Sequence, residues 1–122
     1  MPLLTWFNRL AIAVAGILGA AGVAAAAGAT HTGDQAILGP LALIALTQAP
    51  AVLALGLFAG SGRIVRPATA LIGLGALFFS ADLAARHFTG SGLFPLSAPL
   101  GGGAMIAGWV LLIPAAFALR RD

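Results

Sequence analysis

The chain has no cysteine, lysine, glutamate or tyrosine, and charged residues make up only 7% of its 122 residues. Without cysteine it cannot form a disulfide, carry out thiol redox chemistry or bind an iron–sulfur cluster. This absence also excludes the small four-helix membrane oxidoreductases that work through paired thiols. The six basic residues are all arginine and lie scattered along the chain, so no basic patch is dense enough for nucleic acid.

Apolar residues, by contrast, make up 61% of the chain, and the mean hydropathy is +1.07. A soluble domain of this size has a large surface relative to its volume and needs polar side chains to cover it. Six basic and three acidic residues cannot cover such a surface. The medium around most of the chain must therefore be the hydrocarbon of a lipid bilayer.

The apolar residues fall into four long runs, at about residues 10–30, 36–60, 67–85 and 98–119. At about 1.5 Å per helical residue, each run is long enough to cross a hydrocarbon core about 30 Å thick. The first run is too long for the apolar part of a cleaved secretory signal and fits a membrane span. The sequence thus predicts a single membrane domain over residues 1–122, an all-α bundle of four transmembrane helices.

The arginines are distributed unevenly between the two sides of the predicted spans. One side carries Arg9, Arg63, Arg66, Arg120 and Arg121, and the other side carries only Arg86. Arginine is enriched on the cytoplasmic side of membrane proteins. We therefore expect both ends of the chain to be cytoplasmic.

Small residues are frequent in the first and fourth runs, where several pairs are spaced four positions apart. The pairs are Ala15/Gly19, Ala24/Gly28, Gly103/Ala107 and Ala104/Gly108. In lipid there is little hydrophobic drive between helices, so close backbone approach and dispersion contacts must join them. The spacing indicates either packing within one bundle or a face that pairs two copies of the chain.

Asp82 is the only acidic residue inside a predicted span, where a carboxylate is costly unless it is paired, hydrated or protonated. Arg86 follows one helical turn later on the same face, so an ion pair is geometrically natural. Two interpretations stay open: a structural Asp82–Arg86 clamp, or a proton or ion site. His31 and Asp34 follow the first run on the same side and extend this candidate polar site. Their spacing matches no known set of metal ligands, so no metal is expected.

Gln48 lies near the middle of the second run and Trp109 near the middle of the fourth. Counted from the outer face, both residues lie about 16–18 Å deep. The indole N–H of Trp109 can therefore reach the amide of Gln48 or the backbone carbonyl that Pro50 leaves without a donor. We expect a Gln48–Trp109 polar pair in the bundle core, where it holds helices together and takes no part in chemistry.

Several segments carry a resemblance to a known family. They are the small-residue stretch 19–31, Gly-Ala-Leu-Phe-Phe-Ser-Ala-Asp-Leu at 75–83, Ser-Ala-Pro-Leu-Gly-Gly at 97–102 and Ile-Ala-Gly-Trp at 106–109. Over nearly its whole length the chain resembles the domain of unknown function 423 family, which includes the bacterial YgdD and YwdK proteins and a mitochondrial relative in animals. The resemblance implies a four-helix, multi-pass protein of the bacterial plasma (inner) membrane, and it implies no reaction. Many members carry a histidine in the second helix near Gln48, and this chain has none there.

No nucleophile–base pair, phosphate-binding loop or HExxH motif is present in the sequence. It therefore indicates a non-enzymatic integral membrane protein without a cofactor. We expect an accessory or scaffold subunit of a larger membrane complex, or a small oligomer joined through Gly/Ala helix faces, with the lipid bilayer as partner and no nucleic acid. The alternative is a small proton- or ion-coupled transporter that uses Asp82.

Overall fold

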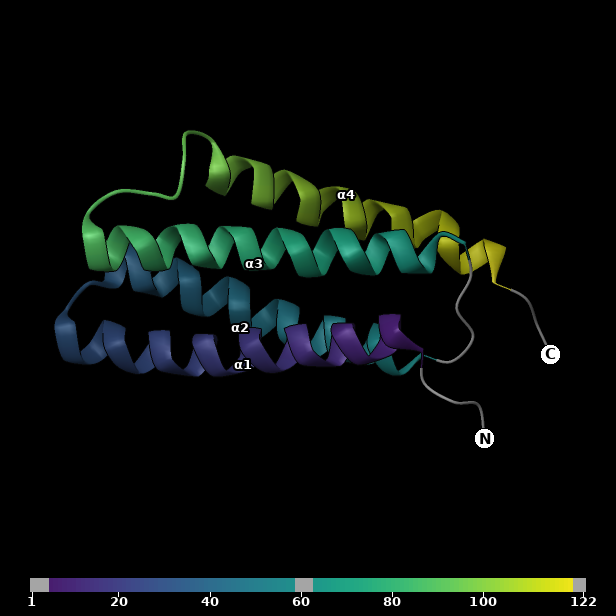
Figure 1. Ribbon diagram of the computed structural model, residues 1–122, viewed down its shortest axis with the longest axis horizontal. Helices are drawn as coiled ribbons and strands as arrows, with labels where there is room; N and C mark the ends of the chain where they lie inside the picture. Colours follow the sequence, from purple (N-terminus) through teal and green to yellow (C-terminus); the bar gives the residue numbers. More distant parts are fainter. Residues whose placement is uncertain (1–4, 59–62, 120–122) are drawn as a thin grey trace.

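The computed structural model describes residues 5–58 and 63–119 of the chain. These residues form four helices: α1 (Trp6–Thr32), α2 (Gln35–Leu57), α3 (Val65–Thr89) and α4 (Ser97–Ala118). This described part contains no strand, and each helix is long and apolar enough to cross a membrane. The predicted all-α fold with four candidate membrane spans is therefore confirmed (Figure 1).

The helices differ from the predicted runs at their ends. α1 begins about one turn before residue 10, because the Thr5 hydroxyl accepts from the Asn8 N–H (3.3 Å) and the Asn8 side chain accepts from the Thr5 N–H (3.0 Å). α3 continues about one turn beyond residue 85 and ends at Thr89. The next residue, Gly90, has a φ of 86°, the left-handed conformation that favours glycine. α2 ends at Leu57, before the predicted residue 60, which lies outside the described ranges.

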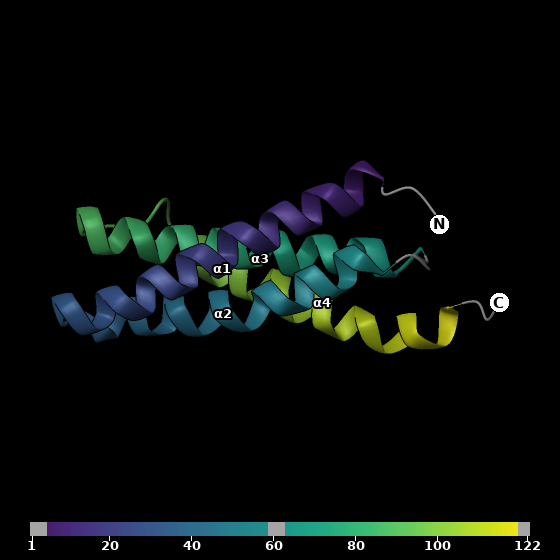
Figure 2. The same cartoon turned by 90° about the horizontal axis from the view of Figure 1, so that it is seen from below.

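The helices form two antiparallel pairs. α1 packs along α2, α3 packs along α4, and the two pairs join mainly through α2 and α3. α1 makes a smaller contact with α3, whereas in the described part of the chain no backbone contact joins α4 to α1 or α2. Figure 1 shows α4 on the side of α3 that faces away from α1 and α2, and Figure 2 shows α1 and α2 in front of α3 and α4. The core is thin and contains small and medium side chains, among which Leu18, Val52 and Ile72 are almost completely buried.

Glycine permits the closest approach between helices. Gly75 and Gly101 face each other where α3 meets α4. A Cβ on Gly75 would lie 2.6 Å from the Gly101 carbonyl oxygen, and one on Gly101 would lie 2.7 Å from the Gly75 carbonyl oxygen. No larger residue fits at either position without separating the helices. Similarly, Gly22 in α1 packs directly against the Leu46 side chain in α2.

Most of the predicted small-residue pairs serve packing within the bundle. Ala15 is buried, and a Cβ on Gly108 would meet the backbone of α3. Gly103 and Ala107, however, are exposed on α4, and a Cβ on Gly103 would meet no atom within 4 Å. One small-residue face therefore remains open on the outside of the bundle.

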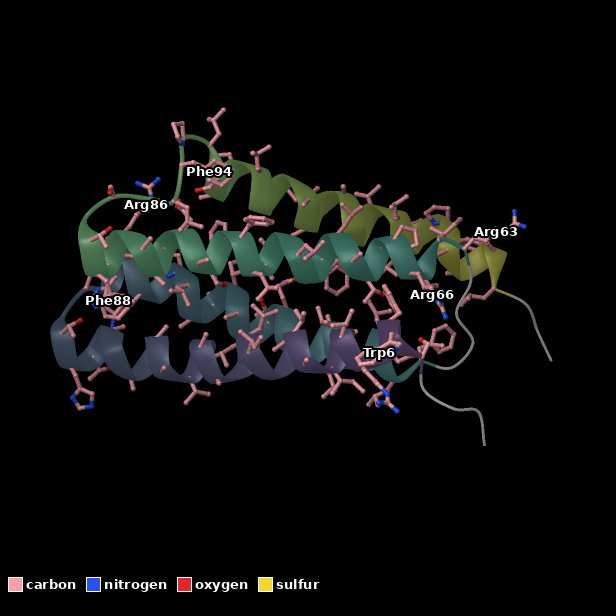
Figure 3. All side chains as sticks on the ribbon, in the orientation of Figure 1. Trp6, Arg63, Arg66, Arg86, Phe88 and Phe94 are labelled. Carbon is pink, nitrogen blue, oxygen red and sulfur yellow. The ribbon has the colours of Figure 1, made fainter. Side chains whose placement is uncertain are left out.

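The two ends of the bundle carry different residues. α1 begins, α2 ends, α3 begins and α4 ends at one end of the molecule, where Trp6, Arg63 and Arg66 lie (Figures 1 and 3). Arg86 and Phe88 lie at the opposite end, with the turns that follow α1 and α3. We call the first the basic end and the second the turn end.

Candidate functional site

Asp82 is the centre of the polar contacts at the turn end. Its side chain is completely buried, and its carboxylate is bonded from three directions. Oδ2 accepts from Arg86 Nε at 2.8 Å, and Oδ1 accepts from the Leu93 backbone N–H at 3.0 Å and from the hydroxyl of Ser97. Arg86 follows Asp82 by one turn of α3, Leu93 lies in the connection, and Ser97 is the first residue of α4.

The connection between α3 and α4 wraps closely around this carboxylate. A Cβ on Gly92 would overlap Oδ1 of Asp82 and would lie 2.8 Å from an Nη atom of Arg86. Leu96 adopts a φ of 70°, a strained conformation for a non-glycine residue, immediately before Ser97 starts α4. The chain can turn this tightly because Asp82 satisfies donors from both the connection and the start of α4.

The arrangement at Asp82 fits a structural clamp. A carboxylate offers about four lone-pair sites, and three donors already occupy this one. Arg86 also supplies the compensating charge, although its own side chain is 44% exposed. The predicted ion pair between Asp82 and Arg86 is present in the structure. The donors from Leu93 and Ser97 were not predicted; a serine directly before the fourth apolar run was the one available sequence signal.

Asp34 and His87 form a separate contact at the turn end. His87 Nδ1 lies 2.7 Å from Asp34 Oδ2, and their side chains are 17% and 31% exposed. The contact joins the last turn of α3 to the turn between α1 and α2. His31 is exposed on α1, and its side chain forms no hydrogen bond or ion pair with any residue of ranges 5–58 and 63–119. Asp82 and Arg86 therefore form one group, Asp34 a second with His87, and His31 belongs to neither.

No family model, curated protein or solved structure matches this chain.

The described residues also contain no group of three or more His, Asp or Glu side chains that could hold a metal ion. The contacts shown at the turn end are hydrogen bonds and ion pairs between helices and turns.

Gln48 and Trp109 form the third polar group, at mid-height on the bundle. Trp109 Nε1 donates to Gln48 Oε1 at 2.7 Å, and Gln48 Nε2 donates to the Thr47 hydroxyl at 3.1 Å. The predicted contact between Gln48 and Trp109 is therefore present. Its predicted place in the bundle core is wrong, because the pair lies at the surface and Trp109 is 44% exposed. Among the described helices, the backbone of α4 lies close only to that of α3, and the Trp109 side chain reaches α2 along the outside of the bundle.

Asn8 provides a polar contact that the sequence analysis missed. Its side-chain amide donates to the Gly56 carbonyl oxygen at 2.8 Å in a buried position, which joins the start of α1 to the end of α2. The oxygen of the same amide accepts from the Thr5 backbone N–H and so contributes to the cap of α1. The Thr5-x-x-Asn8 spacing resembles a capping box and was the available signal for the cap. The contact with Gly56 depends on the packing of α1 against α2, which that spacing does not indicate.

Proposed function

We propose that this chain is a non-catalytic, multi-pass membrane protein that acts through helix contacts, pairing with a second copy to form a small scaffold for membrane assemblies. The observation that supports it is the hydrogen-bonded pair of Gln48, which is half-buried, and Trp109, which is exposed on the outside of the bundle. Lipid tails cannot satisfy the hydrogen-bonding groups of such a pair, whereas another protein helix can.

The depth of the pair supports this proposal. Gln48 lies 13 residues after Gln35, the first residue of α2, and Trp109 lies 12 residues after Ser97, the first residue of α4. At 1.5 Å per residue these separations correspond to about 20 Å and about 18 Å. Both side chains are thus near the middle of the hydrocarbon layer, far from water and from lipid headgroups.

The amide of Gln48 has capacity left for one more donor and one more acceptor contact. A glutamine amide carries two N–H donors and an oxygen with two lone pairs. One N–H of Gln48 already donates to the Thr47 hydroxyl, and one lone pair of its oxygen already accepts from Trp109. The remaining N–H of one copy can bond to the remaining lone pair of a second copy, and a two-fold axis makes the two bonds equivalent.

The surface beside the pair permits a second copy to approach. Gly102 and Ile106 precede Trp109 by seven and three residues, so the three lie on one face of α4. A Cβ on Gly102 would meet no atom within 4 Å, and Ile106 is 67% exposed. This face is open and combines a small residue with a large apolar one, as at packed helix interfaces in membranes.

The proposal is tested by measuring self-association in phosphatidylcholine liposomes by energy transfer between labelled copies. Interhelical hydrogen bonds in membranes contribute about 0.6–2 kcal/mol each. Gln48→Leu removes both symmetry-related bonds, so it is expected to lower the association constant about 10- to 1,000-fold. Gln35→Leu removes the same amide at the exposed start of α2 and serves as the matched control. A wild-type protein that stays monomeric at all lipid dilutions contradicts the proposal, as does equal association in Gln48→Leu.

We further propose that both ends are cytoplasmic and that the chain resides in the bacterial inner membrane as a member of the domain of unknown function 423 family. The described arginines support this orientation, since Arg9, Arg63 and Arg66 belong to the basic end and Arg86 to the turn end. Arg120 and Arg121, which the sequence analysis counts with the cytoplasmic group, lie outside the described residues. The family resemblance supports the location.

A further inference from the structure

The basic end of the bundle combines arginine with aromatic rings. The guanidinium of Arg66 lies 5.4 Å from the centre of the Phe7 ring, and that of Arg9 lies 5.7 Å from the centre of the Trp6 ring. Asp34 and Asp82, the acidic residues in the described part of the chain, both lie at the turn end. The described charge at the basic end is therefore entirely positive.

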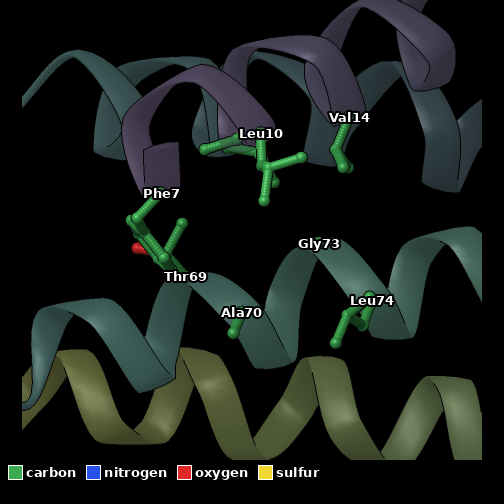
Figure 4. Close-up of a pocket in the computed structure, with 9 residues that line it drawn as sticks. Phe7, Leu10, Val14, Thr69, Ala70, Gly73 and Leu74 are labelled. Carbon is green, nitrogen blue, oxygen red and sulfur yellow. The ribbon is translucent and has the colours of Figure 1, made fainter. Parts of the chain in front are cut away.

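An apolar crevice begins beside these residues and runs between α1 and α3 (Figure 4). Its volume is about 160 Å³, and it is partly open to the outside. The walls include Phe7, Leu10 and Val14 from α1, and Ala70 and Leu74 from α3. The crevice lies in the half of the bundle nearer the basic end, because these residues belong to the first turns of both helices.

The one polar side chain in the wall, Thr69, is almost completely buried and has no free hydrogen-bond donor for a polar ligand. Its hydroxyl donates to the Val65 carbonyl oxygen at 2.7 Å, within its own helix. A cavity without available polar groups does not hold water, and an apolar cavity of about 150 Å³ can accept a molecule as large as benzene. In a bilayer, the apolar groups that can fill such a cavity are the acyl chains of lipids.

Phe7 connects the crevice to the positive charge. Its side chain forms part of the crevice wall, and its ring also packs against the guanidinium of Arg66. Arg66 is exposed and is the second residue of α3, so it lies at headgroup depth when the helix spans the bilayer. A lipid with one chain in the crevice would have its phosphate close to this arginine.

We propose that the crevice between α1 and α3 binds one acyl chain of an anionic phospholipid, whose phosphate is bound by Arg66. Guanidinium groups bind phosphate through paired, charge-assisted hydrogen bonds. Basic sites between transmembrane helices on the cytoplasmic side commonly bind anionic lipid headgroups. The site does not involve Gln48 or Trp109, so it is independent of the proposed self-association.

The test is lipid binding to the detergent-solubilised full chain, measured by native mass spectrometry with phosphatidylglycerol and phosphatidylcholine of identical acyl chains. The wild type is expected to bind phosphatidylglycerol more tightly. A basic residue near the surface contributes about a five-fold preference for anionic lipid. Arg66→Gln is expected to lose this preference, whereas Arg63→Gln, which removes the same charge at the same end, is expected to keep it.

A second pair of variants tests the crevice itself. Ala70→Phe fills the crevice and is expected to weaken the binding of both lipids, whereas Ala20→Phe, on an exposed face of α1, is not. Ala70→Leu replaces Ala70→Phe if the larger ring lowers the melting temperature of the protein. Three results would overturn the proposal: equal binding of the two lipids by the wild type, equal losses in Arg63→Gln and Arg66→Gln, or unchanged binding when the crevice is filled. Competition by millimolar inorganic phosphate would also overturn it, because the ligand would then be the free anion.

Discussion

Ser97, the first residue of α4, donates its hydroxyl hydrogen to the Asp82 carboxylate, which lies almost two turns before the end of α3. The two residues are separated by 15 positions in sequence, and the connection between them bonds to the same carboxylate through Leu93. The helical pair α3–α4 is therefore joined at two places: at Asp82 near the turn, and at the crossing of Gly75 and Gly101. Each of these two contacts can be tested by its own substitution.

Asp82→Ala is expected to destabilise the protein. The substitution removes the acceptor of three donors, two of which are held in place by the backbone of the connection and the start of α4. Because Arg86 can turn to solvent, the expected loss is about 2–4 kcal/mol, below that of a completely buried ion pair. Unfolding in mixed micelles with increasing sodium dodecyl sulfate measures it. Asp34→Ala, at a partly exposed pair with His87, is the control and is expected to cost less than about 1 kcal/mol.

Asp82→Asn distinguishes the clamp from the transport hypothesis. If the carboxylate serves as a clamp, reconstituted wild-type protein and Asp82→Asn will show the same proton flux in liposomes with an imposed pH gradient. A wild-type flux above that of empty liposomes, abolished in Asp82→Asn while the variant remains folded, would show that Asp82 is a proton site. Circular dichroism of the same proteoliposomes checks that both proteins remain helical.

Gly101→Ala is expected to separate α3 from α4. The new methyl group would lie 2.7 Å from a carbonyl oxygen and 2.8 Å from the Phe79 backbone nitrogen, neither of which can move without moving α3. Overpacking of this kind costs about 1–3 kcal/mol. Gly103→Ala is the matched control on the same helix, because its methyl group meets open space and alanine favours the helix. A similar melting temperature for both variants in detergent would contradict the close approach.

The proposed orientation predicts which turns are accessible from outside the cell. Because the chain has no cysteine, single-cysteine variants can be labelled without background. Ser91→Cys, in the exposed turn after α3, is expected to react with a membrane-impermeant maleimide in intact bacteria. Phe58→Cys, at the end of α2, is expected to react only after permeabilisation. The reverse pattern would place the basic end outside the cell.

The four helices could be predicted because continuous apolar runs of this length have no stable alternative in lipid. The ion pair of Asp82 and Arg86 could also be predicted, since it follows from helical spacing alone. The contact between Gln48 and Trp109 was found by comparing their depths along the helix axes. Depth, however, does not determine how a helix is rotated or which neighbours it touches, so the position of this pair on the outside could not be obtained in the same way.

The remaining contacts depend on the path of the connections. The Leu93 N–H is a backbone group that every residue type carries, so no sequence pattern marks it as a partner of Asp82. The contact between His87 and Asp34 requires α3 to remain helical through polar residues beyond the apolar run. It also requires α3 to end beside the turn between α1 and α2. Both requirements depend on how the helices pack, which the sequence pattern does not indicate.

The central claim is that hydrocarbon, and not water, surrounds these four helices. The most direct test is to wash bacterial membranes containing the protein with alkaline carbonate and then to remove detergent from the purified protein. We expect the protein to stay with the membrane pellet and to precipitate when its detergent is removed. A helical, monodisperse protein in detergent-free buffer would contradict it.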